Sequence, residues 1–177
     1  MNAAAGGGVV TVVDCVGGEL IFESGSECDT VRLGAALAGV VCGGLTLSLN
    51  GQLGSGKTHF VRALATGLGV SESHVSSPTF VVLQQYVDGR IPLAHFDVYR
   101  LGDVDEFLGL GGAEYLDSGE WLCLVEWGER LGAVLPADHL VVEISHAGET
   151  SRLFRFRATG RLSAGVLGGL RQVLGAV

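Results

Sequence analysis

The residues with the most specific chemistry form one octet, Gly51-Gln52-Leu53-Gly54-Ser55-Gly56-Lys57-Thr58, which fits the pattern GxxxxGK[ST]. In this pattern the glycines let backbone N–H groups turn toward an anion, the lysine reaches phosphate oxygens, and the hydroxyl serves magnesium. Lys57 is the only lysine in 177 residues, beside ten arginines. A compact ammonium fits a tight loop between two phosphates, where a planar guanidinium is too large. The octet therefore predicts a nucleotide phosphate-binding loop.

The segments on both sides of the octet support this prediction. The apolar run 45–49 predicts a buried parallel strand, and residues 57–68 predict a helix whose N-terminus adds partial positive charge beneath the phosphates. Strand, loop and helix thus follow in the order that the motif requires. The residues of this region that we expect to contact the nucleotide are Gly51, Leu53, Gly54, Ser55, Gly56, Lys57, Thr58 and His59.

Two acids follow apolar runs and are candidates for the chemistry. Residues 91–96 lead into Asp97, and residues 121–125 lead into Glu126. Nucleotide sites of open α/β sheets lie at the carboxyl ends of the strands. Phosphoryl transfer there requires magnesium, charge neutralisation and a positioned nucleophile, all of which carboxylates can serve. The alternative for either acid alone is an ordinary solvated charge at a strand end.

Four further residues allow two interpretations each. Thr79, after Ser-Ser-Pro, could sense a γ-phosphate or simply begin a strand. His95 could be a polar partner of the site or a structural histidine, and Trp127 could cover the site or only pack. Arg152 could reach the nucleotide, although its strand has the alternation of a half-buried strand with a solvated face.

Composition limits the classes of function. A chain of 18.3 kDa with 47% apolar residues can bury one full core, so we expect one domain over residues 9–177 after a disordered tail, 1–8. A net charge of −8 argues against holding nucleic acid through the chain's own field. We expect Cys15, Cys28, Cys42 and Cys123 to be small core residues in a reducing cytoplasm, because no CxxC pair occurs. Glycines interrupt the uncharged stretch between Arg32 and Lys57, which excludes a membrane span.

The remaining pattern predicts a layered α/β domain of P-loop NTPase type, with a mixed, largely parallel sheet flanked by helices. An Asp88-Gly89 turn between two apolar runs predicts an antiparallel hairpin. The expected strands are 19–23, 45–49, 80–86, 91–99, 121–125, 140–145 and 152–158. The expected helices run from the capping residues at 24–29 to about 41, and over 57–68, 104–108, 113–116 and 163–174.

Four motifs together resemble one family. They are the octet, Ser77-Pro78-Thr79-Phe80, His95-Phe96-Asp97-Val98-Tyr99-Arg100 and Leu124-Val125-Glu126-Trp127. In order and approximate spacing they resemble the TsaE family, also called YjeE, from about Glu27 to Ile144. Generic phosphate-loop proteins do not share the HFDxYR and EW elements.

The resemblance implies a small bacterial ATPase that is required to make N6-threonylcarbamoyladenosine (t6A) in tRNA. It implies ATP and Mg²⁺ as cofactors, TsaD and TsaB as partners, contact with tRNA only through that complex, and no membrane. ATP hydrolysis would support turnover by the complex rather than the transfer chemistry. From the residues alone, two alternatives stay open: a small-molecule kinase that uses the same loop, and a nucleotide-gated binding module with negligible catalysis.

By motif position, the resemblance implies that Lys57 holds the phosphates and that Thr58 and Glu126 bind magnesium. Asp97 would organise the water or metal shell, and Thr79 would belong to a switch-like loop. Glu27 and Arg152 fall near positions that contact the nucleotide in relatives.

The chain departs from the family pattern at three positions. Gln52 replaces an acid inside the loop, His59 stands where a second threonine is common, and Gly128 stands where proline is frequent. The first two remove no phosphate ligand. The third is expected to loosen the turn after Trp127.

Overall fold

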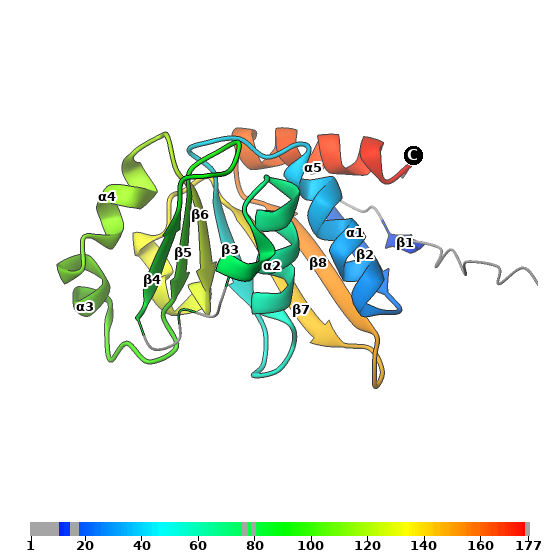
Figure 1. Cartoon of the computed structure of the whole chain (residues 1–177), viewed down its shortest axis with the longest axis horizontal. Helices are drawn as coiled ribbons and strands as arrows, with labels where there is room; N and C mark the ends of the chain where they lie inside the picture. Colours follow the sequence, from blue (N-terminus) through cyan, green and yellow to red (C-terminus); the bar gives the residue numbers. More distant parts are fainter. Residues whose placement is uncertain (1–10, 15–17, 76–77, 79–80, 176–177) are drawn as a thin grey trace, which may run out of the picture.

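The computed structural model describes residues 11–14, 18–75, 78 and 81–175. Its centre is an eight-stranded sheet (Figure 1). The strands are β1 (Thr11–Asp14), β2 (Glu19–Ser24), β3 (Thr46–Asn50), β4 (Leu83–Tyr86), β5 (Leu93–Asp97), β6 (Leu122–Glu126), β7 (Leu140–His146) and β8 (Arg152–Ala158). Their order across the sheet is β1-β2-β8-β7-β3-β6-β5-β4.

Parallel pairing is confined to the centre of the sheet. Strands β7, β3, β6 and β5 are parallel neighbours, whereas β1, β2, β8 and β4 join the sheet by antiparallel pairing. The central strands β5 and β6 are buried at every residue, which fits continuous apolar runs covered on both faces. The predicted mixed sheet and the predicted hairpin at Asp88-Gly89, β4–β5, are confirmed, and β7 and β8 form a second antiparallel pair.

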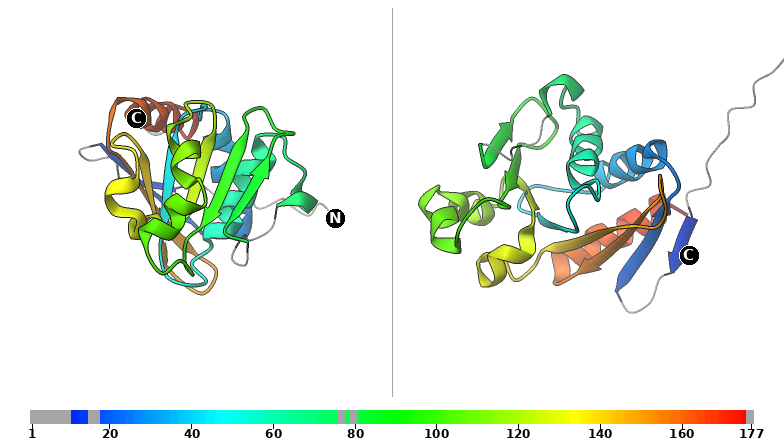
Figure 2. Two further views of the ribbon diagram at one scale, coloured as in Figure 1. Left: turned by 90° about the vertical axis from the view of Figure 1, so that its left-hand side faces the viewer. Right: turned by 90° about the horizontal axis from the view of Figure 1, so that it is seen from below.

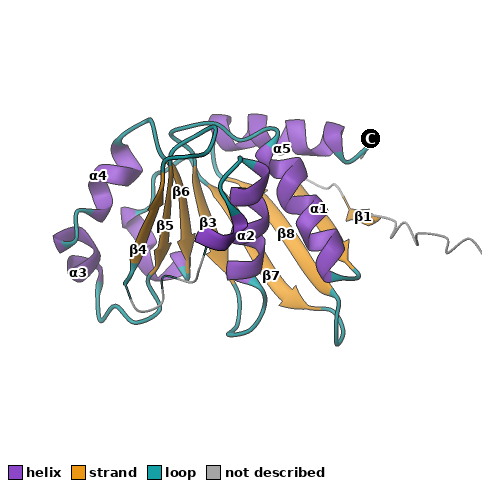
Figure 3. Ribbon diagram, in the orientation of Figure 1, coloured by secondary structure: helices purple, strands orange, loops and turns teal. Residues whose placement is uncertain are grey.

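Helices cover the two faces of the sheet at different places (Figures 1 and 3). The helices are α1 (Glu27–Ala38), α2 (Lys57–Gly67), α3 (Val104–Gly109), α4 (Gly112–Asp117) and α5 (Arg161–Val173), with 3-10 turns η1 (Glu72–His74) and η2 (Gly128–Val134). Helices α1 and α2 pack on one face, above β3 and β8. Helices α3 and α4 and η2 pack on the other face of β5 and β6. Helix α5 lies along the end of the sheet opposite the phosphate loop (Figure 1).

Local sequence explains the start of α1 and its close packing. The Ser26 hydroxyl accepts the Asp29 N–H and so caps the helix, as the sequence predicts. A Cβ on Gly34 would lie 2.5 Å from the Cβ of Ala63, so this glycine allows α1 to approach α2. Helix α1 ends at Ala38, three residues before the predicted end, because the N–H groups of Gly39 and its successors close turns onto residues 35–37.

The structure also departs from the sequence-based expectations. Strand β1 and η2 were not predicted, because each is short and its pairing or packing depends on distant segments. Cys123 is buried, but Cys28 is exposed on α1, so the expectation of a core position was wrong for Cys28. The 1–8 tail and Cys15 lie outside the described residues. Within the described ranges no helix has both the length and the apolar character that crossing a bilayer requires.

Candidate nucleotide-binding site

The phosphate loop connects β3 to α2 at the carboxyl edge of the parallel strands (Figure 2). Gly51 has φ +148°, and a Cβ there would lie 2.3 Å from the carbonyl oxygen of Ile144, so only glycine fits. Gly56 has φ +104° and directly precedes the first turn of α2. The hydroxyl of Ser55 is fully buried and has no hydrogen-bond partner among the described residues. The loop therefore has the backbone shape and a spare polar group that suit an anion.

Lys57 is buried, and its ammonium is turned onto the loop itself. Its Nζ donates to the carbonyl oxygens of Gly51 at 2.7 Å and Gln52 at 3.0 Å, and it lies 3.8 Å from the ring centroid of Trp127. Burial lowers the pKa of Lys57, while the carboxylates of Glu126, Glu129 and Asp97 act in the opposite direction. A phosphate would replace weak carbonyl acceptors with a strong anionic partner for this partly desolvated cation.

Glu126 lies at the end of β6, and two side chains hold its carboxylate. The Thr58 hydroxyl donates to Oε1 at 2.8 Å and to Oε2 at 3.0 Å, and His95 Nε2 lies 2.8 Å from Oε1. Because an ionised carboxylate only accepts, His95 Nε2 carries the hydrogen. A hydroxyl and a carboxylate are hard oxygen donors of the kind that Mg²⁺ uses together with waters and nucleotide phosphates. No group of three or more acidic, cysteine or histidine side chains in the described part of the chain forms a metal site.

Asp97 ends β5 and stands directly beside Glu126 in the parallel register. It is only 4% exposed, and its Oδ1 accepts the backbone N–H of Tyr99 at 3.0 Å. A cavity of about 280 Å³ opens in front of these acids. Its lining residues are Leu53, Gly54, Gly56, Lys57, Thr58, His59, Asp97, Tyr99, Glu126 and Trp127.

A second cavity, of about 470 Å³, adjoins the first along the loop. The two share Gly54, Gly56 and His59. Glu27 at the start of α1 and Arg152 at the start of β8 line the second cavity, and Arg152 Nε donates to the carbonyl oxygen of Ser55 at 3.1 Å. The phosphate loop therefore borders two adjoining cavities.

The structure thus brings together almost all of the site residues predicted from the sequence. Leu53, Lys57, Thr58, Asp97 and Glu126 line the first cavity, while Glu27, Ser55 and Arg152 line the second, and Gly54, Gly56 and His59 line both. Gly51 lines neither cavity; its carbonyl oxygen accepts a hydrogen bond from the Lys57 ammonium. Thr79 lies outside the described residues. The contacts of these side chains with a nucleotide stay predictions.

Sequence reasoning left two contributors undecided. His95 is fully buried and binds Glu126, and Trp127 covers the Lys57 ammonium with its ring centroid 4.9 Å from that of Tyr99. For His95 a signal was present: it stands two residues before Asp97 on a strand, so both side chains share a face. For Trp127 the signal was absent, because its position depends on an unusual backbone conformation with φ +63°.

The turn after Trp127 is not loose, contrary to the expectation for Gly128. Gly128 is buried, and a Cβ there would lie 2.4 Å from the Ser48 hydroxyl on β3. The absence of a side chain lets η2 approach β3 closely. Gly128 therefore fixes the turn that carries Glu126 and Trp127.

Comparison with known proteins assigns the family. The family model described as "Threonylcarbamoyl adenosine biosynthesis protein TsaE" matches residues 24–154. The chain belongs to the TsaE family. The matched segment extends from the end of β2 to the middle of β8, so it contains every lining residue of both cavities, from Ser26 to Phe154.

Individual TsaE relatives agree with this assignment. The chain is 44% identical over 117 residues to the tRNA threonylcarbamoyladenosine biosynthesis protein TsaE of Bacillus subtilis, which covers 66% of this chain and 72% of the relative. It is 38% identical over 129 residues to the protein of that name from Treponema pallidum, covering 73% and 93%. The crystal structure of Bacillus subtilis YdiB superposes with a TM-score of 0.72 at 31% identity, covering 87% of this chain and 95% of that one.

Proposed function

We propose that this chain is a magnesium-dependent ATPase of the bacterial t6A machinery, which works in the cytoplasm, binds TsaB- and TsaD-like proteins and supports their turnover. The contact between Thr58 and Glu126 beside the buried Lys57 carries this proposal. A hydroxyl, a carboxylate and an ammonium within one small cavity are the groups that phosphoryl transfer from a metal-bound nucleotide requires.

Each side chain has a distinct proposed role. Lys57 binds the terminal phosphates and offsets their charge, and Thr58 and Glu126 hold Mg²⁺. Bound Mg²⁺ supplies Lewis-acid neutralisation of the phosphate oxygens. Asp97, next to Glu126, orients the attacking water. Arg152 and Glu27 hold the nucleoside half, since both line the adjoining cavity.

One observation disfavours a small-molecule kinase, and a second favours ATP over GTP as the nucleotide. A small-molecule kinase usually carries arginines on a lid over the phosphates, and the sequence shows no arginine-rich lid segment. A GTPase of the Ras type would use an Asn-Lys-x-Asp element for guanine, but the only lysine belongs to the phosphate loop.

With a net charge of −8, the chain is suited to reach tRNA through its partners rather than by its own field.

Reconstitution with TsaB, TsaD, tRNA and threonylcarbamoyl-adenylate tests the proposal. We expect one round of modification without this chain, and repeated rounds only with the chain and ATP. Lys57→Ala should abolish the repeated rounds. Arg161→Ala, which removes one exposed cation on α5, is the matched control and should behave as wild type.

Three results would contradict the proposal. Equal turnover with and without the chain would remove the assigned role in the machinery. A phosphorylated small molecule as the product would favour the kinase. Nucleotide binding without hydrolysis, even with the partners present, would favour the gated binding module.

A further inference from the structure

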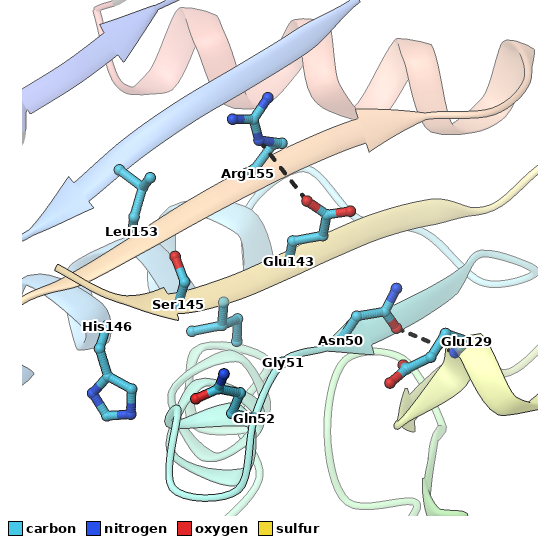
Figure 4. A pocket seen from close by; sticks show the side chains of 10 residues that line it. Asn50, Gly51, Gln52, Glu129, Glu143, Ser145, His146, Leu153 and Arg155 are labelled. Atoms are coloured by element: carbon cyan, nitrogen blue, oxygen red, sulfur yellow. Dashed lines mark hydrogen bonds and ion pairs between the residues drawn. The ribbon is translucent and has the colours of Figure 1, made fainter.

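A third cavity, of about 650 Å³, lies on the face of the sheet opposite α1 and α2 (Figure 4). Glu143 and Ser145 on β7 and Leu153 and Arg155 on β8 line it, in alternation with the core residues Val142, Phe154 and Phe156, which face α1 and α2. We call it the back-face pocket. Its lining residues are Asn50, Gly51, Gln52, Glu129, Glu143, Ile144, Ser145, His146, Leu153 and Arg155. None of them lines the first or the second cavity, which we call the nucleotide cavities after the function proposed for them.

The surface around the back-face pocket is open. Glu143 and Arg155 stand on neighbouring strands with side chains 55% and 43% exposed. Figure 4 shows both side chains on the strand surface, with η2 at one side and no described helix across the labelled side chains. The pocket therefore continues into the exposed surface of β7 and β8, where Glu143 and Arg155 are accessible to a partner.

The charges of the pocket favour a cation. Arg155 is already committed to two carboxylates, with its Nη1 3.0 Å from Glu19 and its Nε 3.9 Å from Glu143. Glu129 makes no ion pair within the described residues. Among the lining residues, Arg155 therefore stands beside two carboxylates, Glu129 and Glu143, and the excess is negative. A lysine or arginine of a partner would complement that charge.

Two residues of the phosphate loop also line the back-face pocket. Gly51 and Gln52 line the pocket and also give their carbonyl oxygens to the Lys57 ammonium. Asn50 Oδ1 accepts the Ser48 hydroxyl at 2.9 Å and the Glu129 N–H at 3.3 Å, which ties η2 to the end of β3 (Figure 4). A group bound here contacts the residues that position Lys57 without entering the nucleotide cavities.

We propose that the back-face pocket receives a lysine or arginine side chain of a partner protein, carried on a segment that lies across β7 and β8. This inference rests on the proposed function, which supplies the partner, and adds the surface and the chemistry of recognition. Because the pocket and the loop share Gly51 and Gln52, the partner binds next to the residues that hold Lys57.

Two variants test the pocket by independent means. Glu143→Lys reverses one charge, and Ser145→Trp fills the cavity; both positions are exposed and lie outside the nucleotide cavities. Glu120→Lys is the matched control, because it makes the same charge change at an exposed site before β6. The measurements are the affinity of each variant for the TsaB–TsaD complex and, separately, for a non-hydrolysable ATP analogue.

We expect Glu143→Lys and Ser145→Trp each to weaken binding to TsaB–TsaD by at least about tenfold, because like charges repel and a filled cavity excludes the side chain. Affinity for the ATP analogue should stay at the wild-type value, and Glu120→Lys should match wild type in both. Wild-type partner binding by both pocket variants, or an equal loss in the control, would overturn the inference alone. Failure of the wild type to bind TsaB–TsaD would instead refute the partner in the proposed function, and this inference with it.

Discussion

The two ends of the sheet differ in how their polar groups are paired. At the end with α5, polar groups satisfy one another locally: the carboxylate of Asp138 accepts the N–H groups of Leu162 and Ser163 at 2.7 and 3.0 Å and the Ser163 hydroxyl at 2.7 Å. At the end with the phosphate loop, Lys57, Asp97 and Glu126 are each at most 5% exposed and lie around an open cavity.

This difference separates a structural end from a functional one. Buried charges cost stability unless they are paired, so a protein that only needed to fold would not gather an ammonium and two carboxylates at one edge. The capped helix end follows from folding alone. The nucleotide that we propose would explain the loop end, because its phosphates would pair with the buried ammonium.

Glu126→Gln, at the end with the phosphate loop, should have the largest effect on activity. The substitution keeps the shape of the side chain but removes the charge that would hold Mg²⁺, so we expect ATP hydrolysis to fall by about 100- to 1000-fold. Hydrolysis measured over a range of Mg²⁺ concentrations checks the prediction. Hydrolysis at the wild-type rate in this variant would separate Glu126 from the metal.

Gly51→Ala should damage both the loop and the fold. A Cβ at this position would meet the Ile144 carbonyl oxygen at 2.3 Å, and the φ of +148° strains any other residue. We expect a loss of about 1–3 kcal/mol in the free energy of unfolding, together with weaker nucleotide binding. Urea unfolding and calorimetry measure the two effects. Gly168→Ala, in α5 where a Cβ meets nothing within 4 Å, is the control that should not destabilise.

His95→Leu should affect magnesium use more than folding. His95 does not line the nucleotide cavities and acts through Glu126, so it is a positioning residue. We expect about 10- to 100-fold weaker activation by Mg²⁺. His95→Gln keeps an N–H donor and should recover part of that loss. Equal activation constants in the two variants would indicate that His95 only fills space.

Asp138→Ala should have the smallest effect, confined to stability. Losing the cap of α5 should cost about 1 kcal/mol, with nucleotide binding unchanged. Burial acts to raise the pKa of Asp138, but hydrogen bonds from Ser163, Leu162 and Arg161 outweigh it and lower the pKa below 3.8. The stabilisation is therefore present above pH 3.8 and lost as pH falls through the lowered pKa.

Denaturation of wild type and Asp138→Ala across this pH range tests the sign. The difference in the free energy of unfolding should shrink as the solution becomes more acidic. A difference that does not change with pH would contradict the predicted role of the Asp138 carboxylate. Reduced nucleotide binding in the variant would contradict a purely structural role for this end of the sheet.

The sequence predicted the parts of the site that local chemistry determines. The loop, the start of α2 and the two strand-end acids each follow from a few consecutive residues, because glycine conformation and apolar runs act locally. That these parts lie close together in space was predictable only because the carboxyl ends of parallel strands meet at one edge of the sheet. On that basis we expected Asp97 and Glu126 at the same edge, and the register shows in addition that they are direct neighbours.

Other features depend on contacts between distant segments. The back-face pocket joins residues 50–52, 129, 143–146, 153 and 155, so no local pattern could reveal it. The position of Trp127 over Lys57 depends on the close approach of Gly128 to Ser48. Strand β1 is only four residues long and needs β2 as its template.

The most direct test of the central claim is a calorimetric titration of the chain with a non-hydrolysable ATP analogue in the presence of Mg²⁺. The account predicts one site per chain in wild type and in Arg161→Ala, with binding lost or greatly weakened in Lys57→Ala although that variant remains folded. Binding of equal strength in folded Lys57→Ala, or no binding by wild type, would contradict it.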